Sequence, residues 1–106
     1  MHFKIKSIIK PFLAFATLTL VAMACSQVLY VPTQADADKT GISTDSLSLG
    51  RSMYVDNCAS CHALYKPERF TQKEWTHIMP IMQKKANCTN EQASVMMKYI
   101  LVRARL

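Results

Sequence analysis

Residues 47–62 read LSLGRSMYVDNCASCH, and they contain the pattern that decides the fold. The apolar side chains of this stretch recur on one face of a predicted helix: Leu47, Leu49, Met53 and Tyr54. Asp45 or Ser46 is the expected N-cap, and the helix is expected to end at Cys58. The stretch therefore predicts a helix with two cysteines and a histidine at its C-terminal end.

The N-terminus has the pattern of an export signal. Residues 2–10 carry three lysines and no acidic residue, and residues 11–24 are uncharged, largely apolar and end in small side chains. An apolar run of this length is short for a membrane span, which needs roughly 20 residues. Residues 1–24 are therefore predicted to be a signal peptide.

The sequence Ala22-Met23-Ala24-Cys25 resembles a bacterial lipoprotein box, although the box usually has Leu where this chain has Ala22. It predicts that Cys25 becomes the lipidated first residue of the mature chain. Cleavage near Ala24 without lipidation, and an uncleaved anchor extending to Val31, are the alternatives. The expected location is the periplasmic or extracytoplasmic face of a membrane, with the protein anchored as a lipoprotein.

The composition of the remaining chain limits the fold and the function. Three of the 13 Lys and Arg residues lie in the leader, so residues 25–106 carry ten against seven Asp and Glu, or +3. This charge does not indicate a nucleic-acid surface. Two glycines, four prolines and several segments of helical period predict an all-α fold. Because so small a core is marginally stable, a disulfide, metal or cofactor is expected to hold it.

Domain boundaries follow from the same periodicity. Residues 25–44 mix proline, glycine, Ser, Thr and Asp without a helical period and predict a flexible tether, followed by one domain over residues 45–106. Capping boxes mark two further helix starts: Thr71–Glu74 and Thr89–Gln92. Pro80 is expected to break or restart the first of these helices. The second is expected to reach about Arg103, with an apolar face formed by Ala93, Met96, Met97, Ile100 and Ala104.

Cys58-Ala59-Ser60-Cys61-His62 is a C-x-x-C-H motif, which in an exported protein predicts covalent attachment of one c-type haem. Two thiols three positions apart can each add to one vinyl group of a porphyrin. The next residue, His62, then lies under the iron as its proximal ligand. The thioether bonds would also cross-link a core of this size.

Two alternatives to haem use the same residues. A redox-active dithiol needs a βαβ context, which this sequence lacks. A structural zinc site formed by Cys58, Cys61, Cys88 and either His62 or His77 has suitable ligand types but lacks a second paired spacing. Cys88 is otherwise expected to be a buried and inert thiol.

The chain from about Leu47 to Val102 resembles the small monohaem class I cytochromes c. The resemblance is carried by a set of matched positions: Gly50, Tyr54, Cys58, Cys61, His62, Pro67, Glu74, Trp75, Met82 and Tyr99. It implies that an N-terminal and a C-terminal helix cross closely at Gly50 and Tyr99. It also suggests that the carbonyl of Pro67 accepts a hydrogen bond from His62.

The sixth iron ligand is a separate question. Met79 and Met82 lie on either side of Pro80, where a change of backbone direction could present a thioether to the iron. The resemblance, through Glu74-Trp75 and a methionine seven residues after Trp75, implies Met82. Met79, His77 and an open position are the alternatives.

His/Met ligation implies an electron-transfer protein and not an enzyme, with no small-molecule substrate. Its partners would be redox proteins and, through Cys25, the membrane. A haem enzyme or gas sensor with an open distal site is the first alternative. A structural haem subunit of a larger respiratory complex is the second.

Overall fold

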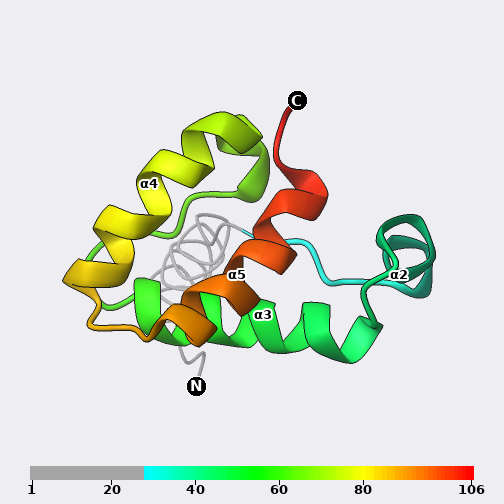
Figure 1. Cartoon of the computed structure of the whole chain (residues 1–106), viewed down its shortest axis with the longest axis horizontal. Helices are drawn as coiled ribbons and strands as arrows, with labels where there is room; N and C mark the ends of the chain where they lie inside the picture. Colours follow the sequence, from blue (N-terminus) through cyan, green and yellow to red (C-terminus); the bar gives the residue numbers. More distant parts are fainter. Residues whose placement is uncertain (1–27) are drawn as a thin grey trace, which may run out of the picture.

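The computed structural model describes residues 28–106, which form a helical domain (Figure 1). In chain order its elements are α2 (Gln34–Thr40), α3 (Thr44–Cys58), the 3₁₀ helix η1 (Pro67–Arg69), α4 (Gln72–Lys85) and α5 (Asn90–Arg103). Within these residues, β-type pairing is limited to one isolated bridge between Thr71 and Arg105. The predicted all-α fold is confirmed.

Polar caps fix where the helices begin. Both predicted capping boxes are present: Thr71–Glu74 at α4 and Thr89–Gln92 at α5. In α3 the Ser43 hydroxyl accepts a hydrogen bond from the backbone N–H of Ser46 at 3.2 Å. The N-cap of α3 is therefore Ser43, two residues before the earlier of the two predicted caps.

The helices α3 and α5 cross (Figure 1). At Gly50 of α3 a side chain has no room. A Cβ atom at this position would lie 2.4 Å from the carbonyl oxygen of Val95 and 2.9 Å from the Cβ of Tyr99. Glycine disfavours a helix, but only glycine allows the two backbones to approach so closely. The close crossing that the resemblance implied is confirmed.

The core lies around this crossing. Its fully buried side chains come from three helices and η1: Leu47, Pro67, Trp75, Met96, Tyr99 and Ile100. On α3 the inward positions are Leu47, Gly50 and Tyr54, which are three and four residues apart. That spacing turns Leu49 outward, where it is 49% exposed, so its predicted place on the core face is wrong.

Helix α4 continues through Pro80 without a break, contrary to prediction. The missing N–H of Pro80 would have bonded the carbonyl of Thr76, one turn earlier. Both residues lie on the exposed side of α4, where water can replace the lost bond. Met79 consequently keeps its helical position and points toward the core.

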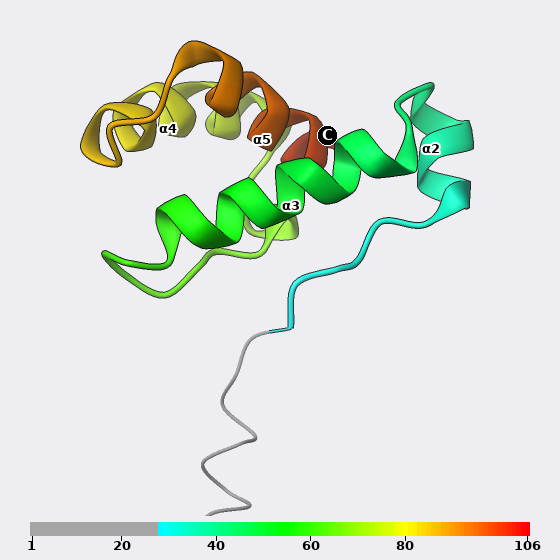
Figure 2. The same cartoon turned by 90° about the horizontal axis from the view of Figure 1, so that it is seen from below.

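The segment predicted as a flexible tether contains a helix. α2 begins at a capping box in which Thr33 and Asp36 bond each other's backbone N–H groups, and it ends at Gly41 with a φ of 69°. α2 lies at the N-terminal end of α3, and the preceding residues run along the domain (Figure 2). Leu29 and Ala37 are buried, so residues 28–44 are part of the packed domain.

Candidate cofactor site

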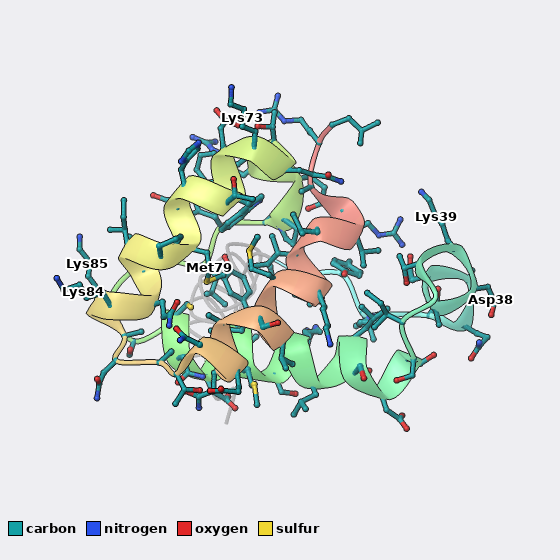
Figure 3. All side chains as sticks on the ribbon, viewed as in Figure 1. Asp38, Lys39, Lys73, Met79, Lys84 and Lys85 are labelled. Atoms are coloured by element: carbon teal, nitrogen blue, oxygen red, sulfur yellow. The ribbon has the colours of Figure 1, made fainter. Side chains whose placement is uncertain are left out.

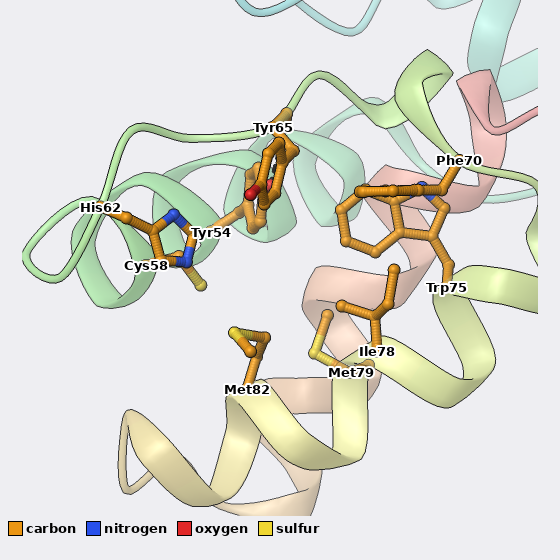
Figure 4. A pocket seen from close by; sticks show the side chains of 9 residues that line it. All are labelled: Tyr54, Cys58, His62, Tyr65, Phe70, Trp75, Ile78, Met79 and Met82. Atoms are coloured by element: carbon orange, nitrogen blue, oxygen red, sulfur yellow. Dashed lines mark hydrogen bonds between the residues drawn. The ribbon is translucent and has the colours of Figure 1, made fainter.

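An apolar cavity opens between the end of α3, the loop that follows it and α4 (Figure 4). Its empty space is about 630 Å³, part of it open to solvent. The lining side chains are Tyr54, Cys58, His62, Tyr65, Phe70, Trp75, Ile78, Met79 and Met82. Three of the predicted haem-site residues therefore lie around one space: Cys58, His62 and Met82.

One wall of the cavity is the inward face of α4. Its residues are three or four positions apart and share one side of the helix: Trp75, Ile78, Met79 and Met82. This spacing is that of an amphipathic helix. His77 is exposed and does not line the cavity, so the geometry gives it no place at the site.

The polar atoms of the largest wall residues are engaged elsewhere. The indole N–H of Trp75 donates to the carbonyl of Pro67 at 2.8 Å, and the hydroxyl of Tyr54 donates to the carbonyl of Tyr65 at 2.7 Å. Burial raises the pKa of Tyr54, so this phenol stays neutral. The wall consequently offers an apolar surface, which suits a flat macrocycle.

The indole bond corrects one implication of the resemblance. The Pro67 carbonyl accepts from Trp75, whereas Nδ1 of His62 lies 2.7 Å from the carbonyl oxygen of Ala63. Because a carbonyl can only accept, Nδ1 is the protonated nitrogen of His62. In the neutral imidazole this leaves Nε2 with its lone pair, as a histidine that ligates a metal requires.

The two motif cysteines border neighbouring cavities. Cys58 is half-buried and lines the apolar cavity, while Cys61 is exposed and lines an adjoining space of about 490 Å³. Cys58, His62 and Met82 line both spaces. Burial raises the pKa of the Cys58 thiol, and the neighbouring Cys88 and Cys61 add to this effect. The two thiols therefore border adjoining spaces, and His62, the residue directly after Cys61, lines both of them.

Met79 and Met82 differ in their packing. Met79 is 5% exposed and belongs to the central hydrophobic cluster. Met82 is half-buried, and its side chain faces His62 across the cavity (Figure 4). Both methionines line the cavity, but Met82 lies outside the central hydrophobic cluster to which Met79 belongs.

The alternatives to haem find no support in the described residues. Across residues 28–106 no three His, Cys, Asp or Glu side chains are placed to hold a metal ion, which argues against the zinc site. The same residues contain no strand that could supply the context of a redox dithiol. Cys88 is half-buried against the core and unpaired, close to the expectation of a buried thiol.

Sequence reasoning missed part of the cavity. Tyr65 and Phe70 lie in the segment between α3 and α4, which has no periodicity that could predict their direction. The ring of Phe70 meets Tyr65 and Trp75 edge to face, each at 5.3 Å between centroids. Ile78 could have been found, because it lies three residues after Trp75 on the same helix face.

The residues present fit a c-type haem by their chemistry. Two thiols, an imidazole with a free Nε2 and a thioether border an apolar space with no unsatisfied buried side-chain polar atom among the described residues. These are the ligand types that attach and coordinate haem in c-type cytochromes. Cys25, the predicted lipidation site, lies outside the described residues.

Comparison with known proteins agrees with this chemistry. Residues 54–105 match the family model described as dihaem cytochrome c. Searches of curated proteins and of solved structures find no match. The match begins at Tyr54, includes the whole C-x-x-C-H motif and ends beyond α5, which supports a c-type cytochrome domain over residues 54–105.

Proposed function

We propose that this chain is an exported electron-transfer protein, a monohaem c-type cytochrome whose haem is bound through Cys58 and Cys61. His62 and Met82 are its axial iron ligands. The observation that carries the proposal is the placement of these two side chains, which face each other across one apolar cavity beside Cys58 (Figure 4).

The chain's own residues set the character of the site. A bound haem would supply an iron that takes up and releases one electron. The Ala63 carbonyl accepts from Nδ1 of His62, which in the neutral ring leaves Nε2 for the iron, and Met82 offers a soft thioether. A thioether favours ferrous iron and raises the reduction potential relative to two imidazoles. If His62 and Met82 both bind the iron of a haem held here, no position is left for a substrate, and the proposed site is that of a carrier and not of an enzyme.

One haem is proposed although the matching family is described as dihaem. The 106 residues contain a single C-x-x-C-H motif, and no other pair of cysteines has this spacing. The haem content per chain, measured from the absorbance of the pyridine complex, is expected to be one. A value of two would require attachment without a second motif and would reject the monohaem proposal.

Anchoring and partner choice complete the proposal. A lipid on Cys25 would hold the protein at the extracytoplasmic face of a membrane. Within residues 28–106 no helix is long and apolar enough to cross a membrane. Exposed cations occur at both ends of α4 (Figure 3): Lys73, Lys84 and Lys85. Lys66 and Arg69, in the segment before α4, are exposed as well. Lys85 lines the cavity beside Cys61, and such a rim would steer an acidic redox protein toward the site.

Optical spectra of the purified protein, with and without carbon monoxide, test this function. The oxidised protein is expected to show the sulfur-to-iron charge-transfer band in the far red, and the reduced protein is expected to resist carbon monoxide. Ready binding of carbon monoxide together with turnover of peroxide would replace the carrier with the open-site enzyme or sensor.

A further inference from the structure

The segment that leads into the domain is fastened to the α3/α5 crossing. Leu29 is 5% exposed, and the ring of Tyr30 stacks on that of Tyr99 with 4.4 Å between centroids and 8° between planes. The two tyrosines also exchange hydrogen bonds. The Tyr99 hydroxyl donates to the Tyr30 carbonyl at 2.9 Å, and the Tyr30 hydroxyl donates to the Tyr99 carbonyl. Residues 29 and 30 therefore move with the domain.

Charged groups strengthen the same attachment. Nε of Arg51 donates to the Tyr30 carbonyl at 3.1 Å. The guanidinium of Arg103 lies 5.0 Å from the centre of the Tyr30 ring and bonds the buried carboxylate of Asp36 at 2.7 Å. The segment from Leu29 to Asp36 is thus held on the domain at both of its ends.

The chain between Cys25 and this attachment is short. Ser26, Gln27 and Val28 are the three residues between Cys25 and Leu29. Even fully extended, the distance from Cys25 to Leu29 is at most about 14 Å. An anchor at Cys25 therefore keeps the surface around Leu29 close to the lipid headgroups, and the domain cannot swing away on a tether.

The residues on this surface suit contact with lipid. Val28 is 77% and Val31 is 65% exposed, and they flank the two fastened residues. We propose that Val28 and Val31 form a membrane-facing edge through which the domain rests on the phospholipid surface in one orientation. This inference rests on the proposed anchor at Cys25, which holds the edge at the bilayer so that the small contact need not bind alone.

The charges around the edge predict how the contact responds to salt. Arg51 and Arg103 lie beside Tyr30 together with two carboxylates, Asp36 and Glu68. The charges of the two arginines and the two carboxylates cancel, so this surface has little net attraction to anionic lipid headgroups. The contact is apolar and keeps its strength when salt screens surface charge.

The orientation also limits the electron-transfer partner. Cys58 lies seven residues beyond Arg51 on α3, or about 10 Å along the helix axis. The cofactor site therefore stays at one height above the bilayer. The fitting partner is a redox protein that is itself held at the membrane, with its own redox centre at a matching height.

Cysteine labelling on vesicles tests the membrane-facing edge. Lipid-bearing holoprotein with Val31→Cys, in a Cys88→Ser background, is added to preformed phosphatidylcholine vesicles and treated with a bulky, charged maleimide. The matched control is Ile81→Cys, because Ile81 is 55% exposed on α4, away from this edge. Labelling of Val31→Cys is expected to be lost under conditions in which Ile81→Cys reacts fully, at low and at high salt.

A linker variant separates the edge from the anchor. A Gly/Ser insert of about ten residues between Gln27 and Val28 should restore labelling of Val31→Cys without changing the absorption spectrum. Equal labelling of Val31→Cys and Ile81→Cys, on protein whose mass shows lipid at Cys25, would overturn the inference and leave the electron-transfer proposal intact. A mass without lipid would instead reject the anchor, and the edge with it.

Discussion

Replacing Gly50 with alanine tests the closest helix contact of the domain. The added Cβ would lie 2.4 Å from the Val95 carbonyl oxygen and 2.9 Å from the Cβ of Tyr99. Neither atom is the end of a flexible side chain, so α3 and α5 would have to separate. Overpacking of a well-packed core costs about 1–3 kcal/mol, and a clash with backbone belongs at the upper end of that range.

Helix propensity opposes this cost. Alanine is more favourable than glycine by about 1 kcal/mol in a helix. The net effect of Gly50→Ala is therefore a loss of about 2 kcal/mol in the free energy of unfolding. For a domain of this size, this corresponds to a fall in melting temperature of roughly 8–16 °C.

Circular dichroism during thermal unfolding of the holoprotein measures the effect. Ser52→Ala is the control, because Ser52 is exposed on α3 and its replacement should change the melting temperature little. If Gly50→Ala raised the melting temperature, as it would at a solvent-facing position of a helix, the close crossing of α3 and α5 would be refuted.

Three further changes probe the site and the core. Met82→Ala should abolish the far-red band, lower the reduction potential and open the iron to carbon monoxide. Met79→Ala should leave the band, the potential and the resistance to carbon monoxide unchanged, but it should cost about 2–5 kcal/mol of stability because Met79 is buried in the core. The reverse pattern would make Met79 the ligand. Trp75→Phe removes the indole donor to the buried Pro67 carbonyl and should lower the free energy of unfolding, measured in urea, by about 1–3 kcal/mol. Tyr65→Phe, at an exposed position, should lower it less. Burial raises the pKa of Tyr99 to about 12 from its ordinary 10.0, so the stability it contributes is fully present below pH 10 and declines as the pH rises toward about 12. An alkaline unfolding series should show that decline in the wild type and a smaller one in Tyr99→Phe, and equal profiles would refute the assignment.

The sequence predicted the elements whose signals are local. The pattern of Thr followed three residues later by Glu or Gln correctly gave the starts of α4 and α5, because a capping box uses only neighbouring residues. The motif at Cys58 gave the end of α3 for the same reason. The crossing at Gly50 was anticipated through the resemblance, since a glycine in a helix indicates a close contact but does not name its partner.

Other features depend on tertiary packing. α2 has few apolar residues, and its signals are the cap pair Thr33 and Asp36 and the terminal Gly41, which also suit a loop. The arrangement that holds it includes the ion pair of Asp36 with Arg103, distant in sequence. Pro80 was expected to break α4, but whether a missing hydrogen bond matters depends on which side of the helix faces water.

The cofactor site also combines residues with a local sequence signal and residues placed by tertiary packing. Cys58, Cys61 and His62 follow from one motif, whereas Met82 required the resemblance, and the structure adds that it faces His62 without belonging to the core. Tyr65 and Phe70 could not be predicted, because their directions are set by the path of the loop between α3 and α4. The bond of Trp75 to Pro67 displaced the expected partner of His62 for the same reason.

The mass of the denatured, intact protein tests the central claim most directly. Because thioether bonds survive unfolding, the chain is expected to carry the added mass of one haem after denaturation, and a Cys58→Ser, Cys61→Ser double variant is expected to lose it. A wild-type chain that, once denatured, has the mass of the polypeptide without haem would contradict the assignment of Cys58, Cys61 and His62 as a covalent haem site.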